Sequence, residues 1–194
     1  MVRERFQPFI EQMVSSHLMS REMFLIRAAT NSGKVNEGAS EDDNDDATLS
    51  ITGSVHSGEI RALYVRDEGE SKVEIVLKLQ PSYPLTLATV EFTRKIGIEE
   101  SRWRRWQLQI MQTLSKQDGS VVDAILIWKN NVQREFKGME PCPVCYCILH
   151  PKTATLPKLE CPTCHNKFHN TCLMHWFKTS GKNKCVPCQQ PFFV

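Results

Sequence analysis

The stretch that decides the fold runs from Cys142 to Cys188 and reads CPVCYCILHPKTATLPKLECPTCHNKFHNTCLMHWFKTSGKNKCVPC. It holds all eight cysteines of the 194-residue chain. A tight turn with two residues between two ligands lets both side chains reach one tetrahedral zinc ion. Four such pairs follow one another: Cys142 and Cys145, Cys161 and Cys164, His169 and Cys172, Cys185 and Cys188. They predict two closed sites for Zn²⁺, which are structural because neither leaves a position open for water.

The linkers predict how the pairs combine. Only residues 165–168 separate the second pair from the third, whereas pairs that share a zinc in a simple finger usually flank a longer hairpin or helix. We therefore expect alternate pairs to share an ion, so that two interleaved loops are pinned by metal in place of a core. The first site would contain Cys142, Cys145, His169 and Cys172, and the second Cys161, Cys164, Cys185 and Cys188.

Disulfides or redox pairs are the alternative for a cysteine-rich segment. They leave the regularly spaced pair of His169 and Cys172 unexplained. Residues 1–20 also carry charges where a secretory leader would be apolar, which favours a metal site over disulfides. Cys147 could replace a neighbouring ligand only by breaking the two-residue spacing, so we treat it as a bystander.

Composition and charge divide the chain at Gly138. Residues 138–194 contain six lysines, no arginine and two glutamates, a formal charge of +4, which leaves −2 for the remainder of a chain with a net charge of +2. That net charge is too small to argue for nucleic-acid binding, and no apolar run is long enough to span a membrane. We expect two domains, residues 1–137 and 138–194.

The first domain has an α+β pattern. We expect a helix over the first thirty residues, with Phe9 and Met13 on one face. A flexible acidic loop is expected over residues 31–46, which have almost no large apolar residue. Runs typical of strands, separated by turns, predict a four-stranded antiparallel meander over residues 48–55, 59–67, 71–80 and 88–93.

Two helices are expected to complete this domain. The first covers residues 99–116, and the second opens at Ser120, whose spacing to Asp123 matches a capping box, and stops near Gly138. Its apolar stripe consists of Val121, Ile125, Trp128, Val132 and Phe136.

Two tryptophans, Trp103 and Trp106, lie among arginines at positions 102, 104 and 105 on the first of these helices. A cluster of this kind could stack on nucleic-acid bases. Because the tryptophans continue at helical spacing into Ile110 and Leu114, we favour a core stripe for them. For the arginines, a solvated face and an RNA contact both stay open.

The ligand order of the zinc segment is shared by plant homeodomain fingers, which read histone tails, and by a class of RING domains. Plant homeodomain fingers carry a Trp two residues before the last pair, where this chain has Asn183. Trp176 instead follows the sixth ligand by four residues, which resembles RING domains. In that family Val144, Trp176 and Pro187 would form the groove for a ubiquitin-conjugating enzyme. Gln189 stands where many RING domains have a cation that also contacts ubiquitin.

The upstream pattern resembles the RWD fold, a relative of ubiquitin-conjugating enzymes without their catalytic cysteine; residues 1–141 contain no cysteine. The segments WRRW at 103–106, DGSVVDAILIWKNNV at 118–132 and FKGMEPC at 136–142 resemble the C-terminal end of the listerin family of ribosome-associated ubiquitin ligases.

The resemblance implies a cytoplasmic, ribosome-associated chain that directs ubiquitin from a conjugating enzyme to lysines of stalled nascent polypeptides on the large ribosomal subunit. The expected mechanism is that of a scaffold, with no catalytic residue and no covalent intermediate on this chain. A zinc-binding adaptor or a histone-tail reader is the alternative function.

Overall fold

The computed structural model describes residues 7–32, 47–66, 71–116 and 119–192. The chain forms two compact units: Met1–Arg94 with Glu99–Arg134, and Lys95–Ile98 with Glu135–Val194. The short segment before the third helix therefore belongs to the same unit as the cysteines. Most of the predicted acidic loop, residues 33–46, lies outside the described residues, and Asn31 is the last residue of a helix.

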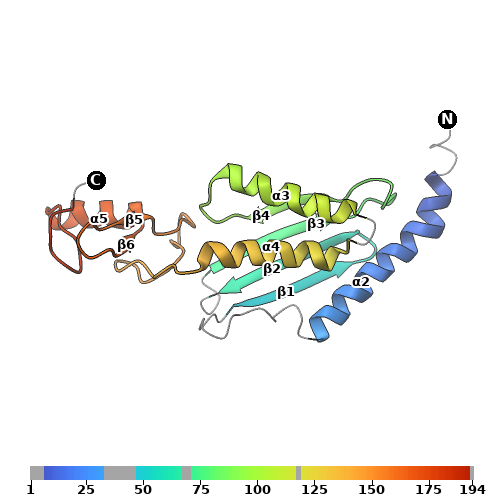
Figure 1. Cartoon of the computed structure of the whole chain (residues 1–194), viewed down its shortest axis with the longest axis horizontal. Coiled ribbons are helices and arrows are strands. Elements are labelled where there is room, and N and C mark those ends of the chain that lie inside the picture. The colour runs from blue at the N-terminus through green and yellow to red at the C-terminus, as the bar shows by residue number, and fades with distance from the viewer. Residues whose placement is uncertain (1–6, 33–46, 67–70, 117–118, 193–194) are drawn as a thin grey trace. The chain divides into compact units, whose positions relative to one another are not determined.

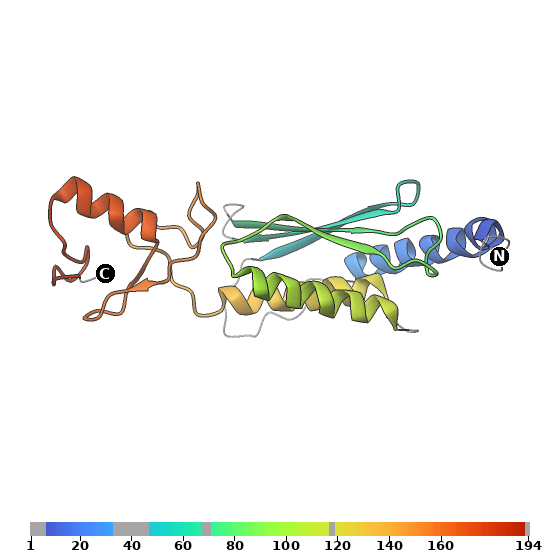
Figure 2. The same ribbon diagram turned by 90° about the horizontal axis from the view of Figure 1, so that it is seen from above.

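The first unit contains a four-stranded antiparallel sheet with strands in chain order: β1 (Thr48–Ser54), β2 (Glu59–Arg66), β3 (Ser71–Lys78) and β4 (Thr89–Arg94). A π-helical turn, η1 (Ile10–Ser15), leads into α2 (Ser16–Asn31). Helices α3 (Glu100–Ser115) and α4 (Val121–Phe136) lie side by side against one face of the sheet (Figures 1 and 2). The predicted meander and both helices are confirmed, with ends that differ by one or two residues.

The core of this unit follows the period-two alternation of the strands. Side chains at alternate positions of β2 and β3 are at most 1% exposed: Ile60, Ala62, Tyr64, Val73, Ile75 and Leu77. The predicted stripe of α4, from Val121 to Phe136, is fully buried. On α3, Trp103 is 1% and Trp106 is 4% exposed, and their ring centroids are 4.8 Å apart. The tryptophans therefore belong to the core, and a base-stacking surface is wrong for them.

The N-terminal helical segment is joined to the rest of the unit by two buried hydrogen bonds. Ser15 donates its hydroxyl to the carbonyl of Tyr83, at 2.6 Å. The buried carboxylate of Glu22 accepts the amide of Val121, at 2.9 Å, and so caps the start of α4 from a position 99 residues away in sequence. Phe9 and Met13 are each 58% exposed, so the face that they share is not part of this core.

The ends of α4 agree with the sequence. Ser120 and Asp123 form the reciprocal capping box: the hydroxyl of Ser120 accepts the amide of Asp123 at 3.1 Å, and the carboxylate of Asp123 accepts the amide of Ser120 at 3.2 Å. After Phe136 the chain leaves the helix, and Gly138 has a φ of +69°, a left-handed conformation that glycine adopts without strain.

The second unit has little regular structure. A hairpin of two-residue strands, β5 (Leu159–Glu160) and β6 (Lys167–Phe168), precedes α5 (Asn170–Ser180), whose C-cap is Gly181 with a φ of +65°. Within the described residues of both units, no helix is long and apolar enough to cross a membrane.

Candidate metal centre

Each of the three Cys-X-X-Cys pairs folds into the same backbone knuckle. The amide of the residue after the second cysteine donates to the carbonyl of the first: Tyr146 to Cys142 at 2.8 Å, His165 to Cys161 at 3.0 Å, and Gln189 to Cys185 at 3.1 Å. The amide of each first cysteine in turn donates to a carbonyl five residues later, in Cys147, Asn166 and Gln190 respectively. The knuckle turns both side chains of a pair toward the same point.

The residue that follows each pair has a positive φ: 60° at Tyr146, 60° at His165 and 59° at Gln189. A residue with a Cβ pays about 1–2 kcal/mol for this conformation. The knuckle is therefore formed at an energetic cost, which is what a turn shaped for a ligand would show. The sequence did not predict this conformation, because none of the three residues is glycine.

The first set contains Cys142, Cys145, His169 and Cys172, whose ligand atoms lie within 4.8 Å of one another. His169 is fully buried, and its Nε2 lies 3.0 Å from the carbonyl oxygen of Ile148. A carbonyl can only accept, so Nε2 carries the proton and Nδ1 has a free lone pair. This Nδ1 faces Cys145 Sγ at 3.4 Å and Cys172 Sγ at 3.8 Å. The histidine is in the tautomer and orientation that a metal ligand needs.

The second set contains Cys161, Cys164, Cys185 and Cys188, again within 4.8 Å of one another. Cys161 Sγ lies 3.8 Å from Cys188 Sγ, and Cys164 Sγ lies 3.6 Å from Cys185 Sγ. A disulfide needs about 2.0 Å, whereas the edge of a tetrahedron with Zn–S arms of 2.3 Å is about 3.8 Å. The sulfur spacing fits a tetrahedral ion and excludes a disulfide in this arrangement.

The pKa values of individual thiols are shifted in opposite directions, even within one set. The side-chain amide of Asn166 donates to Cys164 Sγ at 3.3 Å and lowers the pKa of that thiol to about 6. Burial, reinforced by the neighbouring thiols of its set, raises the pKa of Cys172 to about 12. Burial likewise raises the pKa of Cys185. Four thiols this close cannot all ionise without a cation between them, and binding of Zn²⁺ would supply that cation.

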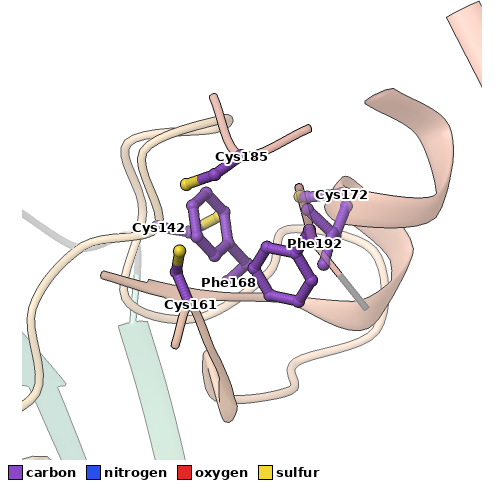
Figure 3. Packing of buried hydrophobic residues seen from close by; sticks show 7 residues of the cluster. Cys142, Cys161, Phe168, Cys172, Cys185 and Phe192 are labelled. Carbon is purple, nitrogen blue, oxygen red and sulfur yellow. The ribbon is translucent and has the colours of Figure 1, made fainter. Parts of the chain in front are cut away.

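A small apolar core lies beside both sets. Figure 3 shows the rings of Phe168 and Phe192 side by side, with cysteines of both sets around them. The ring centroids are 5.8 Å apart and nearly perpendicular, and Leu173 is fully buried in the same cluster. The sequence predicted that metal would replace a core in this segment. The module instead has both metal-ligand sets and a small apolar core. Phe168, which directly precedes the ligand His169 in the sequence, could have indicated this core.

The expected docking residues differ in their surroundings. Val144 is half-buried and packs against the core cluster of the second unit. Trp176 is half-buried on α5, and its indole nitrogen donates to the carbonyl of Lys184 at 3.0 Å. Pro187 is exposed. The amide of Gln189 folds back and donates from Nε2 to the carbonyl of Val186 at 2.7 Å.

The remaining cysteine and histidines lie outside the two sets. Cys147 Sγ lies 3.2 Å from the carbonyl of Cys145. His150 accepts the amide of Thr153 at Nδ1, at 3.2 Å, and its ring meets that of His169 edge-on, with centroids 5.3 Å apart. His165 pairs with Glu160 at the surface. The carbonyl of Ile148, which orients His169, was not predicted, because any residue type supplies a carbonyl.

Comparison with known proteins adds two findings. The sequence matches the family described as "Ubiquitin conjugating domain-like" over residues 49–135. It is 34% identical over 185 residues to the "E3 ubiquitin-protein ligase listerin" of Xenopus tropicalis, covering 95% of this chain and 10% of that protein. The listerin of Saccharomyces cerevisiae is 40% identical over 146 residues, covering 75% of this chain and 9% of the relative. The chain thus spans about a tenth of the length of the curated relatives it matches.

Proposed function

Because the chain belongs to the listerin family and corresponds to its C-terminal region, we propose that it acts as the part of a ubiquitin ligase that recruits a ubiquitin-loaded conjugating enzyme. The observation that carries the proposal is the pair of interleaved four-residue sets in the second unit, in a chain whose other unit is conjugating-domain-like and has no cysteine. Ligand sets of this kind hold a rigid platform in place, which a docking surface needs.

Both sets are proposed to bind Zn²⁺. Cys142, Cys145, His169 and Cys172 would hold one ion, and Cys161, Cys164, Cys185 and Cys188 the other. With four protein ligands each, the ions would leave no position for substrate or water, so their contribution is to fix the fold. Three thiolates in the first set and four in the second would bring the formal +4 of this segment to about +1.

The docking surface is proposed to include Val144, Trp176 and Pro187. Val144 lies in the first knuckle, Pro187 in the last, and Trp176 on α5. Each knuckle is fixed by its backbone hydrogen bonds and α5 by its N-terminal ligand pair, so the three side chains are held by the metal-ligand framework. Apolar side chains on a rigid, polar-rimmed surface are typical of protein-binding hot spots.

The proposed reaction takes place on the bound partners. The amine of a substrate lysine attacks the thioester carbonyl that joins ubiquitin to the conjugating enzyme, an isopeptide bond forms, and the enzyme's cysteine leaves as a thiol. This chain would contribute by restricting the motion of the loaded enzyme, which raises the fraction of reactive orientations. The conjugating-domain-like unit contains no cysteine and can form no thioester of its own.

We also propose that the substrates are stalled nascent chains and that the protein works in the cytoplasm on the large ribosomal subunit. The resemblance of the sequence to ribosome-associated ligases supports this. The exposed residues Arg104 and Arg105 on α3 are candidates for a contact with ribosomal RNA. Binding of the chain to purified large subunits, compared between the native chain and the Arg104→Glu, Arg105→Glu variant, tests this step.

Autoubiquitination with a panel of conjugating enzymes tests the ligase activity. Formation of ubiquitin conjugates that needs both this chain and one of the enzymes supports the proposal. A zinc-loaded, folded chain that is inactive with every enzyme would contradict it and favour an adaptor. Binding of histone-tail peptides by such an inactive chain would favour a reader.

A further inference from the structure

Residues 95–98 belong to the same compact unit as the two metal-ligand sets, although they precede α3 in the sequence. Gly97 makes three contacts there. Its amide donates to the carbonyl of Ala154 at 2.7 Å, it pairs with Thr155 in a parallel β-bridge, and its carbonyl accepts Lys158 Nζ at 3.3 Å. Ile96 is 2% exposed. The segment is therefore an integrated part of the module.

The contact at Gly97 leaves no room for a side chain. A Cβ at this position would lie 2.8 Å from the Cα of Thr155 and 3.0 Å from its Cγ2. The first of these atoms belongs to the backbone, which cannot rotate away as a side chain can. Any other residue would therefore push residues 95–98 and the segment around Thr155 apart.

The segment that Gly97 contacts also orients a ligand of the first set. The amide of Ala154 donates to the carbonyl of His150 at 2.8 Å, and the amide of His150 donates to the carbonyl of Thr155 at 3.0 Å. Two residues before His150, the carbonyl of Ile148 accepts Nε2 of His169. Hydrogen bonds thus connect Gly97 through Ala154 to His150, and two residues of backbone connect His150 to the carbonyl that sets the tautomer of His169.

The second set has a separate support. Its cysteines take their backbone hydrogen bonds within their own knuckles, from Cys161 to Asn166 at 3.0 Å and from Cys185 to Gln190 at 2.9 Å. The side-chain amide of Asn166 also donates, from Nδ2 to the sulfur of Cys164. A displacement of residues 148–155 would change the surroundings of His169 and leave these hydrogen bonds in place.

We propose that Gly97 is a positioning residue for the first metal centre. By holding residues 148–155 in place it keeps the carbonyl of Ile148 on His169, and so it sets the metal affinity of the set with three cysteines and one histidine. The four-cysteine set is independent of it. Partners that orient a ligating histidine commonly contribute 10- to 100-fold to metal affinity. The inference rests on the proposal that both sets bind zinc.

Cadmium is a suitable probe, because in cadmium NMR a site with three sulfurs and one nitrogen gives a resonance separate from that of a four-sulfur site. The full chain is loaded with Cd²⁺ and titrated with a competing chelator while both resonances are followed. In Gly97→Ala, the first site should lose Cd²⁺ at a chelator concentration about 10-fold lower than in the native chain. The second site should be unchanged and serves as an internal control.

Gly181→Ala is the control for general destabilisation of this unit. Nothing lies within 4 Å of its new Cβ, but its φ of +65° strains any residue with a side chain. In this variant, any change in Cd²⁺ affinity should be the same at both sites. Equal loss of both resonances in Gly97→Ala, or retention of both at the native level, would overturn the role of Gly97. A native chain that binds fewer than two Cd²⁺ ions would instead overturn the zinc proposal.

Discussion

Trp176 on α5 donates its indole N–H to the backbone carbonyl of Lys184, at 3.0 Å. This bond joins α5, which has the ligand His169 as its N-cap and contains the ligand Cys172, to the segment that precedes the last pair. The hydrogen bond holds the indole against the polypeptide by its polar end, and its apolar ring surface is half-buried.

We predict that Trp176→Ala keeps both metal ions and loses most ubiquitin transfer, because the substitution removes apolar docking surface and no metal ligand. Trp176→Phe should have intermediate activity, since it keeps an aromatic ring but lacks the donor to Lys184. Discharge of ubiquitin from a loaded conjugating enzyme and the zinc content of the purified protein are the measurements. His175→Ala, an exposed neighbour on α5, is the control. Full activity of Trp176→Ala would remove Trp176 from the docking surface.

Cys147→Ala is expected to keep two zinc ions and normal transfer. Cys147 lies outside both ligand sets, and a scaffold mechanism needs no thiol on this chain. Cys172→Ala, which removes a ligand, should lower the zinc content and abolish activity. If Cys147→Ala retained its zinc yet transferred no ubiquitin, a covalent intermediate on this chain would have to replace the scaffold mechanism.

Gln189→Arg is expected to increase the rate of ubiquitin discharge severalfold. The side chain of Gln189 donates to the carbonyl of Val186 in its own knuckle and carries no charge. An arginine there would extend a cation with five donors toward the bound partners. Gln190→Arg, which adds the same charge at the next exposed position, is the control. Equal rates for Gln189→Arg and the native chain would show that position 189 contacts neither partner.

The sequence predicted the parts of the fold that depend on local pattern. Alternating apolar residues and the turns between them gave the four strands, and the spacing of apolar residues on α3 and α4 gave their buried stripes. The combination of ligand pairs into two sets followed from linker length alone. The structure groups the same residues in the same two sets.

The features that the sequence did not predict depend on backbone groups and on contacts between segments that are distant in sequence. The carbonyl of Ile148 that orients His169 could belong to any residue, and Gly97 meets Thr155 only after the chain has folded. Glu22 looks like an exposed helix residue in the sequence, yet it is 7% exposed and caps a helix that begins at Val121. No local pattern distinguishes such a residue from a solvated one.

Removal of zinc is expected to unfold the second unit and leave the first intact. The first unit has its own large core, which includes Trp103, Ile125 and Trp128, whereas the second depends on its ligand sets and a few aromatic rings. Hydrogen exchange with and without a strong chelator measures this, with β3 and α5 as reporters. Restoration of α5 protection by added zinc is the control. Simultaneous loss of protection in β3 would contradict the independence of the two cores.

The stability of the first unit is expected to depend on Glu22 and on pH. Burial raises the pKa of the Glu22 carboxyl, and the nearby carboxylate of Asp123 acts in the same direction, while the hydrogen bond from Val121 and the charge of Arg21 oppose the shift. The folded state therefore binds this proton more tightly than the unfolded state. The free energy of unfolding should fall as the pH rises from the ordinary carboxyl pKa to the raised one.

Two substitutions at Glu22 separate its charge from its hydrogen bond. Glu22→Gln keeps an acceptor for the amide of Val121 without a charge, so its free energy of unfolding should not fall over this pH range and should exceed that of the native chain at pH 7. Glu22→Ala leaves the amide without that acceptor and should cost about 1–3 kcal/mol at any pH. Urea unfolding followed by tryptophan fluorescence between pH 5 and pH 8 measures both variants. If Glu22→Gln were as unstable as Glu22→Ala throughout, the ionised carboxylate would be the better cap for α4, and its burial would not limit stability.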